Sequence, residues 1–112
     1  MVTPPRERTI TLTDQPPVRI CEREWPVIGR ATEPDGVDIV HHLTVRRHYD
    51  QRTLVYAVRH SRCPYTRELH AGELLSSYDA AAVAQVVARV ADAVRCPALA
   101  SLALASLPAT TI

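Results

Sequence analysis

The chain has 112 residues, of which 46% are hydrophobic and 22% are charged, and its formal net charge is +1. This balance excludes an intrinsically disordered chain and a chain that is attracted to polyanions along its whole length. The length fits one domain with a single core. We expect residues 1–7, which include two prolines, to form a flexible arm and residues 8–112 to form the domain.

The chain begins MVTPPRERT, which lacks the apolar core of a signal peptide, and no run approaches the roughly 18 apolar residues of a membrane span. We therefore expect a cytoplasmic protein that makes no membrane contact. Its bases are all arginine or histidine and it has no phenylalanine, a usage typical of a GC-rich bacterial genome. The three cysteines form no CxxC pair, so we expect free thiols rather than a disulfide framework.

The first third of the chain predicts short strands. Residues 8–13 alternate apolar residues with threonine, and the prolines at 16 and 17 end that strand. Val18 and Ile20 continue an extended segment, residues 21–25 suggest one helical turn, and residues 27–32 predict the next strand. Trp25 is the only tryptophan, and we expect it to close one end of the core rather than to bind a ligand.

The middle of the chain predicts a β-hairpin. The tetrapeptide at 33–36, Glu-Pro-Asp-Gly, suits a turn, and two alternating strands follow from residue 37 and from residue 52. A two-residue loop at Asp50-Gln51 would pair Tyr49 with Arg52 and fix every later pair. That register pairs Val45 with Tyr56 and His41 with His60 on an apolar face, and it pairs Arg46 with Val55 and His42 with Arg59 on an exposed face.

The last third predicts helices. Residues 61–78 suggest a loop with a short helical piece at 72–75, and a long helix follows over residues 79–94, because five valines recur at helical spacing: Val83, Val86, Val87, Val90 and Val94. The tail from Pro97 predicts a short apolar helix with Leu99, Leu102, Leu104 and Leu107. Such a tail must be buried in its own core or against a second copy, so we also expect a homodimer through it.

These elements predict an α+β fold. It is a small antiparallel meander sheet of three to four strands, covered on one face by the long C-terminal helix and the short apolar tail helix.

The exposed face of the predicted hairpin is the candidate partner-binding surface, since six arginines and only two acids lie between His41 and His70. We expect the face to contain His42, Arg46, His48 and Arg59, with Arg47, Arg52 and Arg62 at its rim. Such a surface suits an acidic protein or a phosphate backbone, whereas the alternative is an ordinary solvated sheet face. Readers of single-stranded nucleic acid also present aromatic residues for stacking, and this register directs Tyr56 to the other face.

A metal site is the weaker alternative. It would use His41 and His60 as a cross-strand pair, with Cys63 three residues after His60 and His70 as a further ligand. The spacing matches no zinc finger or HExxH helix, so we expect these histidines to be structural and the protein to need no metal or other cofactor. A thiol enzyme using Cys63 is a further alternative, and without a recognisable catalytic motif we expect a non-enzymatic protein.

The segments ITLTDQPPVRICEREWPVIGRAT, LTVRRHYDQRTLVYAV, AGELL and SLPATTI resemble a group of short uncharacterised proteobacterial proteins that accompany plasmids, phages and integrated elements. The resemblance implies a setting rather than a reaction, because mobile elements encode many small domains that bind and block host proteins, anti-CRISPR proteins among them. It transfers no functional residue. It leads us to expect a protein that inhibits a host protein or defence complex with an acidic surface, with nucleic-acid binding as the competing function.

Overall fold

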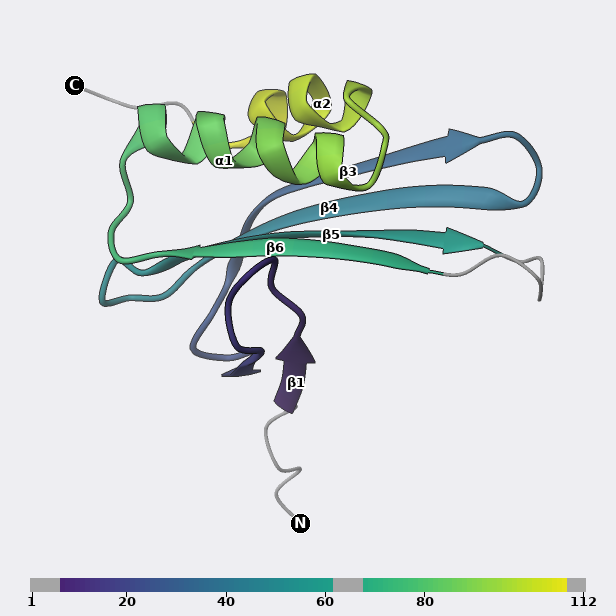
Figure 1. The fold of residues 1–112 in the computed structure, drawn as a ribbon. Coiled ribbons are helices and arrows are strands. Elements are labelled where there is room, and N and C mark those ends of the chain that lie inside the picture. Colours follow the sequence, from purple (N-terminus) through teal and green to yellow (C-terminus); the bar gives the residue numbers. More distant parts are fainter. Residues whose placement is uncertain (1–6, 62–67, 109–112) are drawn as a thin grey trace, which may run out of the picture.

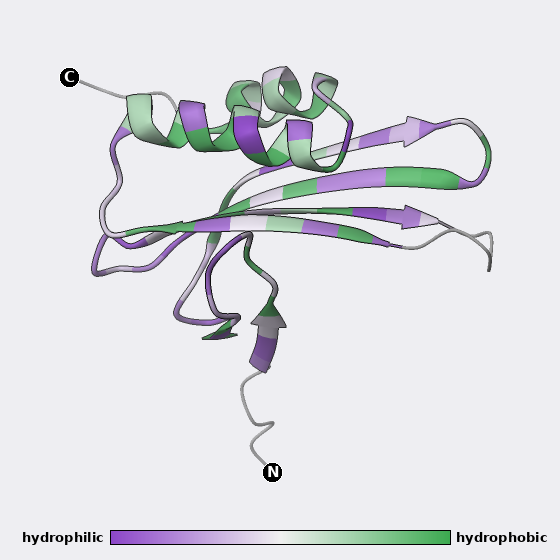
Figure 2. Ribbon diagram, viewed as in Figure 1, coloured by the Kyte–Doolittle hydropathy of each residue, from purple (hydrophilic) through white to green (hydrophobic). Residues whose placement is uncertain are grey.

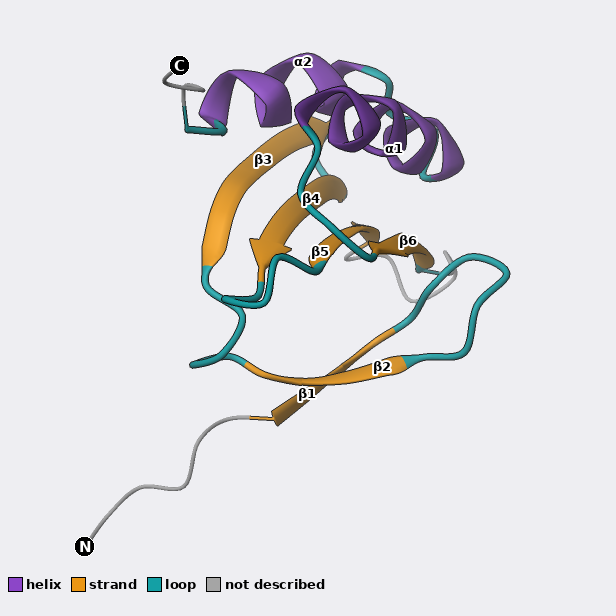
Figure 3. Ribbon diagram, turned by 90° about the vertical axis from the view of Figure 1, so that its left-hand side faces the viewer, coloured by secondary structure: helices purple, strands orange, loops and turns teal. Residues whose placement is uncertain are grey.

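The computed structural model describes residues 7–61 and 68–108, which form a sheet with helices on one face and a hairpin on the other (Figures 1 and 3). Four strands form an antiparallel meander in the order β3-β4-β5-β6, and β1 pairs with β2 in a separate two-stranded sheet. The elements are β1 (Glu7–Ile10), β2 (Val18–Cys21), β3 (Val27–Asp35), β4 (Ile39–Arg47), β5 (Thr53–Ser61), β6 (Leu69–Leu75), α1 (Ala80–Ala93) and α2 (Ala98–Ser106). The predicted α+β class is confirmed.

Several predicted boundaries differ from the structure; for example, β1 spans Glu7–Ile10 rather than residues 8–13, so Glu7 belongs to a strand and not to the predicted arm. The piece at 72–75 is not helical but belongs to β6, because its residues continue the alternation of a strand that lies against β5. The turn expected at 33–36 lies later, since β3 extends through Asp35 and the chain reverses over residues 36–38. Gly36 has a φ of +76°, a conformation that glycine adopts without the strain of a side chain.

The helix side of the sheet carries the larger core. The valine stripe of α1 is buried as predicted, and Asp79 caps the helix by accepting a hydrogen bond from the backbone N–H of Ala82 at 3.2 Å. In α2, Leu99 and Ala103 are buried against the same core. Figure 2 colours α2 mostly hydrophobic, whereas hydrophilic residues recur along α1. These helices pack on one set of alternating sheet residues: Ala31, Leu43, Val45, Val55, Ala57 and Ala71.

The β4–β5 turn has three residues instead of the predicted two. The backbone N–H of His48 donates to the carbonyl of Arg52 at 2.8 Å, and Gln51 adopts a φ of +83°. This is the pattern of a three-residue hairpin loop that ends in a left-handed residue. The extra residue shifts the register by one, so that Val45 pairs with Val55. Every side chain of β5 therefore faces the side opposite to the one predicted.

A second core lies between the sheet and the β1–β2 hairpin. It consists of Ile10, Leu12, Ile20, Trp25 and Leu54. Trp25 is buried there, which confirms its predicted role in packing. This core explains why β5 is apolar on the side that the predicted register placed against the helices: its even-numbered residues are covered by the hairpin.

Polar groups from other segments contact both edges of the sheet. At β6, the backbone N–H of Thr13 donates to the carbonyl of Gly72 at 2.8 Å, and the side chain of Gln15 accepts from the N–H of Leu74 at 3.3 Å. At β3, the hydroxyl of Ser106 accepts from the N–H of Arg30 at 2.9 Å, and Pro34 has no N–H to offer. No helix within the described ranges is long and apolar enough to cross a membrane.

Candidate functional site

The predicted exposed face does not exist as one surface. Arg46 and His48 are each only 5% exposed, and Arg59 pairs with His41, which places it on the helix side of the sheet. Among the four predicted members of the face, only His42 is exposed on the hairpin side. There are two physical reasons. The three-residue β4–β5 turn moves Arg59 to the other face of the sheet, and the β1–β2 hairpin covers Arg46.

Arg46 holds the hairpin against the sheet. Its Nε donates to the hydroxyl oxygen of Tyr56 at 3.0 Å, and one of its terminal nitrogens donates to the carbonyl of Trp25 at 2.9 Å. Glu22 lies 3.8 Å from the other terminal nitrogen. Because the Arg46 guanidinium is buried and its nitrogens already contact Tyr56, Trp25 and Glu22, Arg46 has a structural role and is not accessible to a partner.

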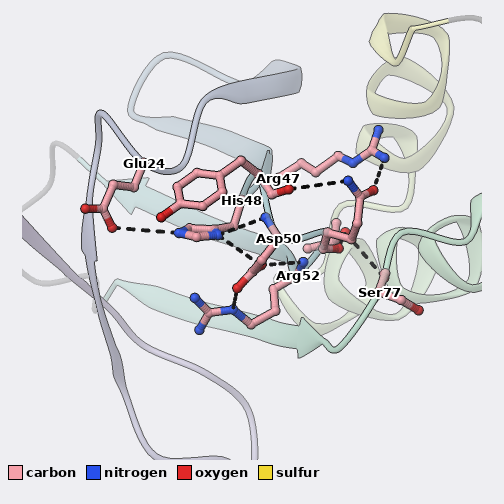
Figure 4. A network of polar contacts seen from close by, with 9 residues as sticks. Glu24, Arg47, His48, Asp50, Arg52 and Ser77 are labelled. Atoms are coloured by element: carbon pink, nitrogen blue, oxygen red, sulfur yellow. Dashed lines mark hydrogen bonds and ion pairs between the residues drawn. The ribbon is translucent and has the colours of Figure 1, made fainter.

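His48 belongs to a polar network at the same end of the sheet (Figure 4). Its Nδ1 lies 2.9 Å from a carboxylate oxygen of Asp50, and its Nε2 lies 3.7 Å from Glu24. Asp50 also accepts a hydrogen bond from Nε of Arg52 at 2.8 Å, and the guanidinium of Arg52 lies 5.0 Å from the ring centre of Trp25. The network ties the β4–β5 turn to the turn after β2.

The three residues predicted at the rim have separate positions. Arg52 belongs to the network just described, whereas Arg47 donates to the side chain of Gln51 and lies 4.3 Å from the ring centre of Tyr78. Arg62 is outside the described residues. The rim therefore does not surround one face.

The predicted histidine pair is also wrong. His41 pairs with Arg59, and His60 pairs with Val40, so the two imidazoles lie on opposite faces of the sheet. His41 is only 1% exposed, its Nε2 is 3.5 Å from Asp35, and its Nδ1 has no hydrogen-bond partner. Cys63 is outside the described residues. Residues 7–61 and 68–108 contain no group of three or more histidine, cysteine or acidic side chains placed to hold a metal ion.

A groove between the hairpin and the sheet is the best candidate site. A cavity of about 210 Å³ opens there, and we call it the hairpin groove; it is lined by Arg8, Arg30, His42, Thr44, Tyr56 and Val58. A smaller cavity of about 130 Å³ shares three of these residues and extends the groove toward His70. The lining contains two arginines and no acid.

The charge of the hairpin groove is only partly balanced. Arg8 forms an ion pair with Glu22 at 3.4 Å, but Glu22 also lies near buried Arg46. The guanidinium of Arg30 makes no ion pair with any residue in the described parts of the chain. The groove therefore carries a positive charge that its own walls do not neutralise.

Three histidines extend this surface across the sheet. His42, Val58 and His70 are direct neighbours on β4, β5 and β6, and His60 lies one position further along the same face of β5. Glu68 contacts both His60 Nδ1 at 2.6 Å and His70 Nε2 at 3.1 Å. Hydrogen bonds from these two imidazoles lower the pKa of Glu68. Partial desolvation, followed by the charges of His60 and Arg30, lowers the pKa of His42.

Sequence reasoning missed Arg8, Arg30, Thr44 and Tyr56 as groove residues. They lie on four different strands or their ends, and only the correct register and the position of the hairpin bring them together. One signal in the sequence could have indicated the groove. Leu54, Tyr56 and Val58 alternate with Val55 and Ala57, so both faces of β5 are apolar. The long helix can cover only one of these faces, which leaves the N-terminal strands to cover the other.

No protein-family model matches this chain, and the searches of curated proteins and of solved structures found no significant match.

Proposed function

We propose that the protein is a non-enzymatic binding protein that engages a negatively charged surface of a partner protein through the hairpin groove. The observation that carries this proposal is the lining of the groove, where two arginines and a histidine face a cavity that contains no acid. Unneutralised arginines beside a concave surface favour binding of carboxylates or other oxyanions, since arginine bonds to them are charge-assisted.

The described thiols do not favour catalysis. Cys96 is buried, and burial raises the pKa of its thiol, so that the reactive thiolate is disfavoured near neutral pH. Cys21 is half-buried at the end of β2. A binding role needs neither thiol.

The setting of a mobile genetic element, implied by the resemblance of the sequence, extends the proposal to the class of target. A small domain encoded by such an element would act on a host protein, and a defence complex with an acidic surface is the target we propose. The compact fold and the preformed groove suit an inhibitor that binds without rearrangement.

Binding of single-stranded nucleic acid is the second candidate, and one observation favours it. Tyr56 lies in the hairpin groove beside Arg30 and His42, rather than on the helix side as the predicted register had it. An aromatic ring among cationic side chains is a common platform for an unpaired base.

The experiment is capture of partners from bacterial lysate with the wild-type protein and with an Arg8→Glu, Arg30→Glu variant. Both arginines are exposed, so the variant should fold normally. We expect a protein that is retained by the wild type after nuclease treatment and lost with the variant. An Arg89→Gln variant, which removes a cation on α1 that is paired with Glu73, should retain it. A partner that is retained equally by all three proteins would contradict the proposal. A partner that disappears on nuclease treatment, with affinity falling steeply with salt, would favour nucleic acid.

We also propose self-association through α2. Its outer surface carries no charge, and Leu102 and Leu104 remain 43% and 38% exposed. Light scattering at rising concentration should detect a dimer that Leu102→Glu disrupts, and a concentrated wild type that stays monomeric would refute it.

A further inference from the structure

Most of the side chains that line the hairpin groove can donate hydrogen bonds. Of its six lining residues, five have a polar side chain that can donate, and the sixth is Val58. Arg30, Thr44 and Tyr56 are direct neighbours across three strands, so their side chains form one row along the floor. Arg8 approaches from the hairpin. The donors therefore reach the cavity from several directions.

The buried Arg46 sets the direction of the tyrosine hydroxyl. Because Nε of Arg46 donates to the hydroxyl oxygen of Tyr56 at 3.0 Å, that oxygen acts as an acceptor toward the core. The ring of Tyr56 is therefore held in a fixed position in the lining of the groove. Arg46, which was expected to bind a partner directly, instead fixes the position of a groove residue.

His42 is held in a similar way. Its Nδ1 lies 3.2 Å from the hydroxyl of Thr32, which leaves Nε2 for a ligand. Partial desolvation and the charges of His60 and Arg30 lower the pKa of His42, so its surroundings disfavour the protonated imidazole. A bound dianion would favour the protonated imidazole and gain another donor.

We propose that the hairpin groove binds a phosphoryl group, carried by a phosphorylated side chain of the partner protein. This inference rests on the proposed function and names the anionic group that is recognised. A carboxylate has two oxygens in one plane, whereas the oxygens of a dianionic phosphate ester point in three directions, which matches donors from the hairpin and from three strands. The cavity of about 210 Å³ accommodates one such group.

The surrounding charges favour a single phosphoryl group over a nucleic-acid strand. The net charge of the chain is only +1. On the hairpin, Arg19 is paired with Glu7 at 2.6 Å, and at the far end of the surface Glu68 lies between two histidines. A polynucleotide needs a continuous cationic path for successive phosphates, and these acids interrupt it.

The test measures binding of sulfate, inorganic phosphate and acetate to the full chain by NMR shift changes of groove amides. Sulfate is a dianion at every pH used, so any change of its affinity with pH reports the protein. We expect sulfate and phosphate to bind more tightly than acetate, and Arg30→Gln to weaken both about ten- to hundredfold. Arg89→Gln on the opposite side of the sheet carries the same charge change and should bind as the wild type does. Sulfate affinity should fall as the pH rises through the titration of His42, and His42→Gln should remove that dependence.

A second arm uses a phosphothreonine peptide, its unphosphorylated form and a single-stranded oligonucleotide. The phosphopeptide should bind and be displaced by sulfate, and the other two should not. Equal binding of acetate and sulfate, or binding of the oligonucleotide in preference to the phosphopeptide, would overturn the inference. If phosphoryl binding fails while capture of a partner still depends on Arg8 and Arg30, the proposed function stands and only the phosphoryl group is wrong.

Discussion

The two faces of the β3–β6 sheet are covered in different ways. On the helix side, the valines of α1 and Leu99 of α2 seal a continuous apolar layer over small and branched sheet residues. On the hairpin side, a few large apolar residues share the interface with buried Arg46 and His48, which are bonded to the hairpin and its turn. A larger cavity of about 410 Å³ lies at the β6 edge beside α1, but there Arg89 is paired with Glu73. The hairpin groove differs in that the guanidinium of Arg30 in its lining has no acidic partner among the described residues.

Truncating one residue in the core under the helices and one in the core under the β1–β2 hairpin should have the largest effects. Leu43→Ala, in the helix-side core, should lower the free energy of unfolding by about 2–5 kcal/mol, because a fully buried leucine leaves a cavity. Ile20→Ala should instead accelerate hydrogen exchange in β1 and β2 more than in β4 and β5, since the hairpin is a separate sheet. Denaturant titration and native-state exchange measure both, and equal acceleration in all four strands would show that the two faces unfold together.

Substitutions of Arg46 and Arg59 test whether the buried contacts of Arg46 hold the β1–β2 hairpin on the sheet. Arg46→Gln should cost on the order of 3 kcal/mol, because the carbonyl of Trp25 and the hydroxyl of Tyr56 lose a buried donor. Arg59→Gln, at a half-buried position on the other face, should cost about 1 kcal/mol or less. Thermal unfolding of the two variants is the measurement. Similar losses would mean that the hairpin does not depend on Arg46.

The segment after β1 lies close against the sheet at Gly72. A Cβ at this position would lie 2.9 Å from the carbonyl oxygen of Thr11 and 3.1 Å from Cβ of Tyr56. Gly72→Ala should therefore destabilise the protein by about 1–3 kcal/mol and displace the hairpin. Gly36→Ala is the control, since its space is open and its cost of about 1–2 kcal/mol comes from the positive φ alone. Only Gly72→Ala should change the tyrosine fluorescence and the exchange of hairpin amides.

The smallest expected effect concerns pH. The pKa of His42 is below its ordinary value of 6.5 in the folded protein, so the unfolded chain binds the proton more readily. Stability should fall slightly as the pH is lowered through about 6.5, and the loss should stop once His42 is protonated in both states. The melting temperature of His42→Gln should vary less between about pH 7.5 and 5.5 than that of the wild type. The lowered pKa of Glu68 contributes only at more acidic pH, because its stabilisation is lost as the pH falls below the ordinary range of a carboxyl group.

The fold could be predicted because its signals are local. The valine spacing of α1, its Asp79 cap and the alternation within β4 each depend on residues close together in the chain. The site could not, because it depends on the register of β5 and on the position of the β1–β2 hairpin. Gln51 adopts a positive φ in a turn without glycine or asparagine at that position, and nothing in the local sequence indicates this. That single residue decides whether Tyr56 and Arg46 share a face.

The contacts at the sheet edges have a consequence for solubility. An open strand edge invites a strand from another molecule, and such pairing can propagate into aggregates. Here Thr13 and Gln15 occupy hydrogen-bonding positions along β6. At β3, Ser106 accepts a hydrogen bond from the N–H of Arg30, and Pro34 has no N–H that another strand could use. The loop that anchors the β1–β2 hairpin to β6 therefore also protects this edge of the sheet against pairing with another molecule.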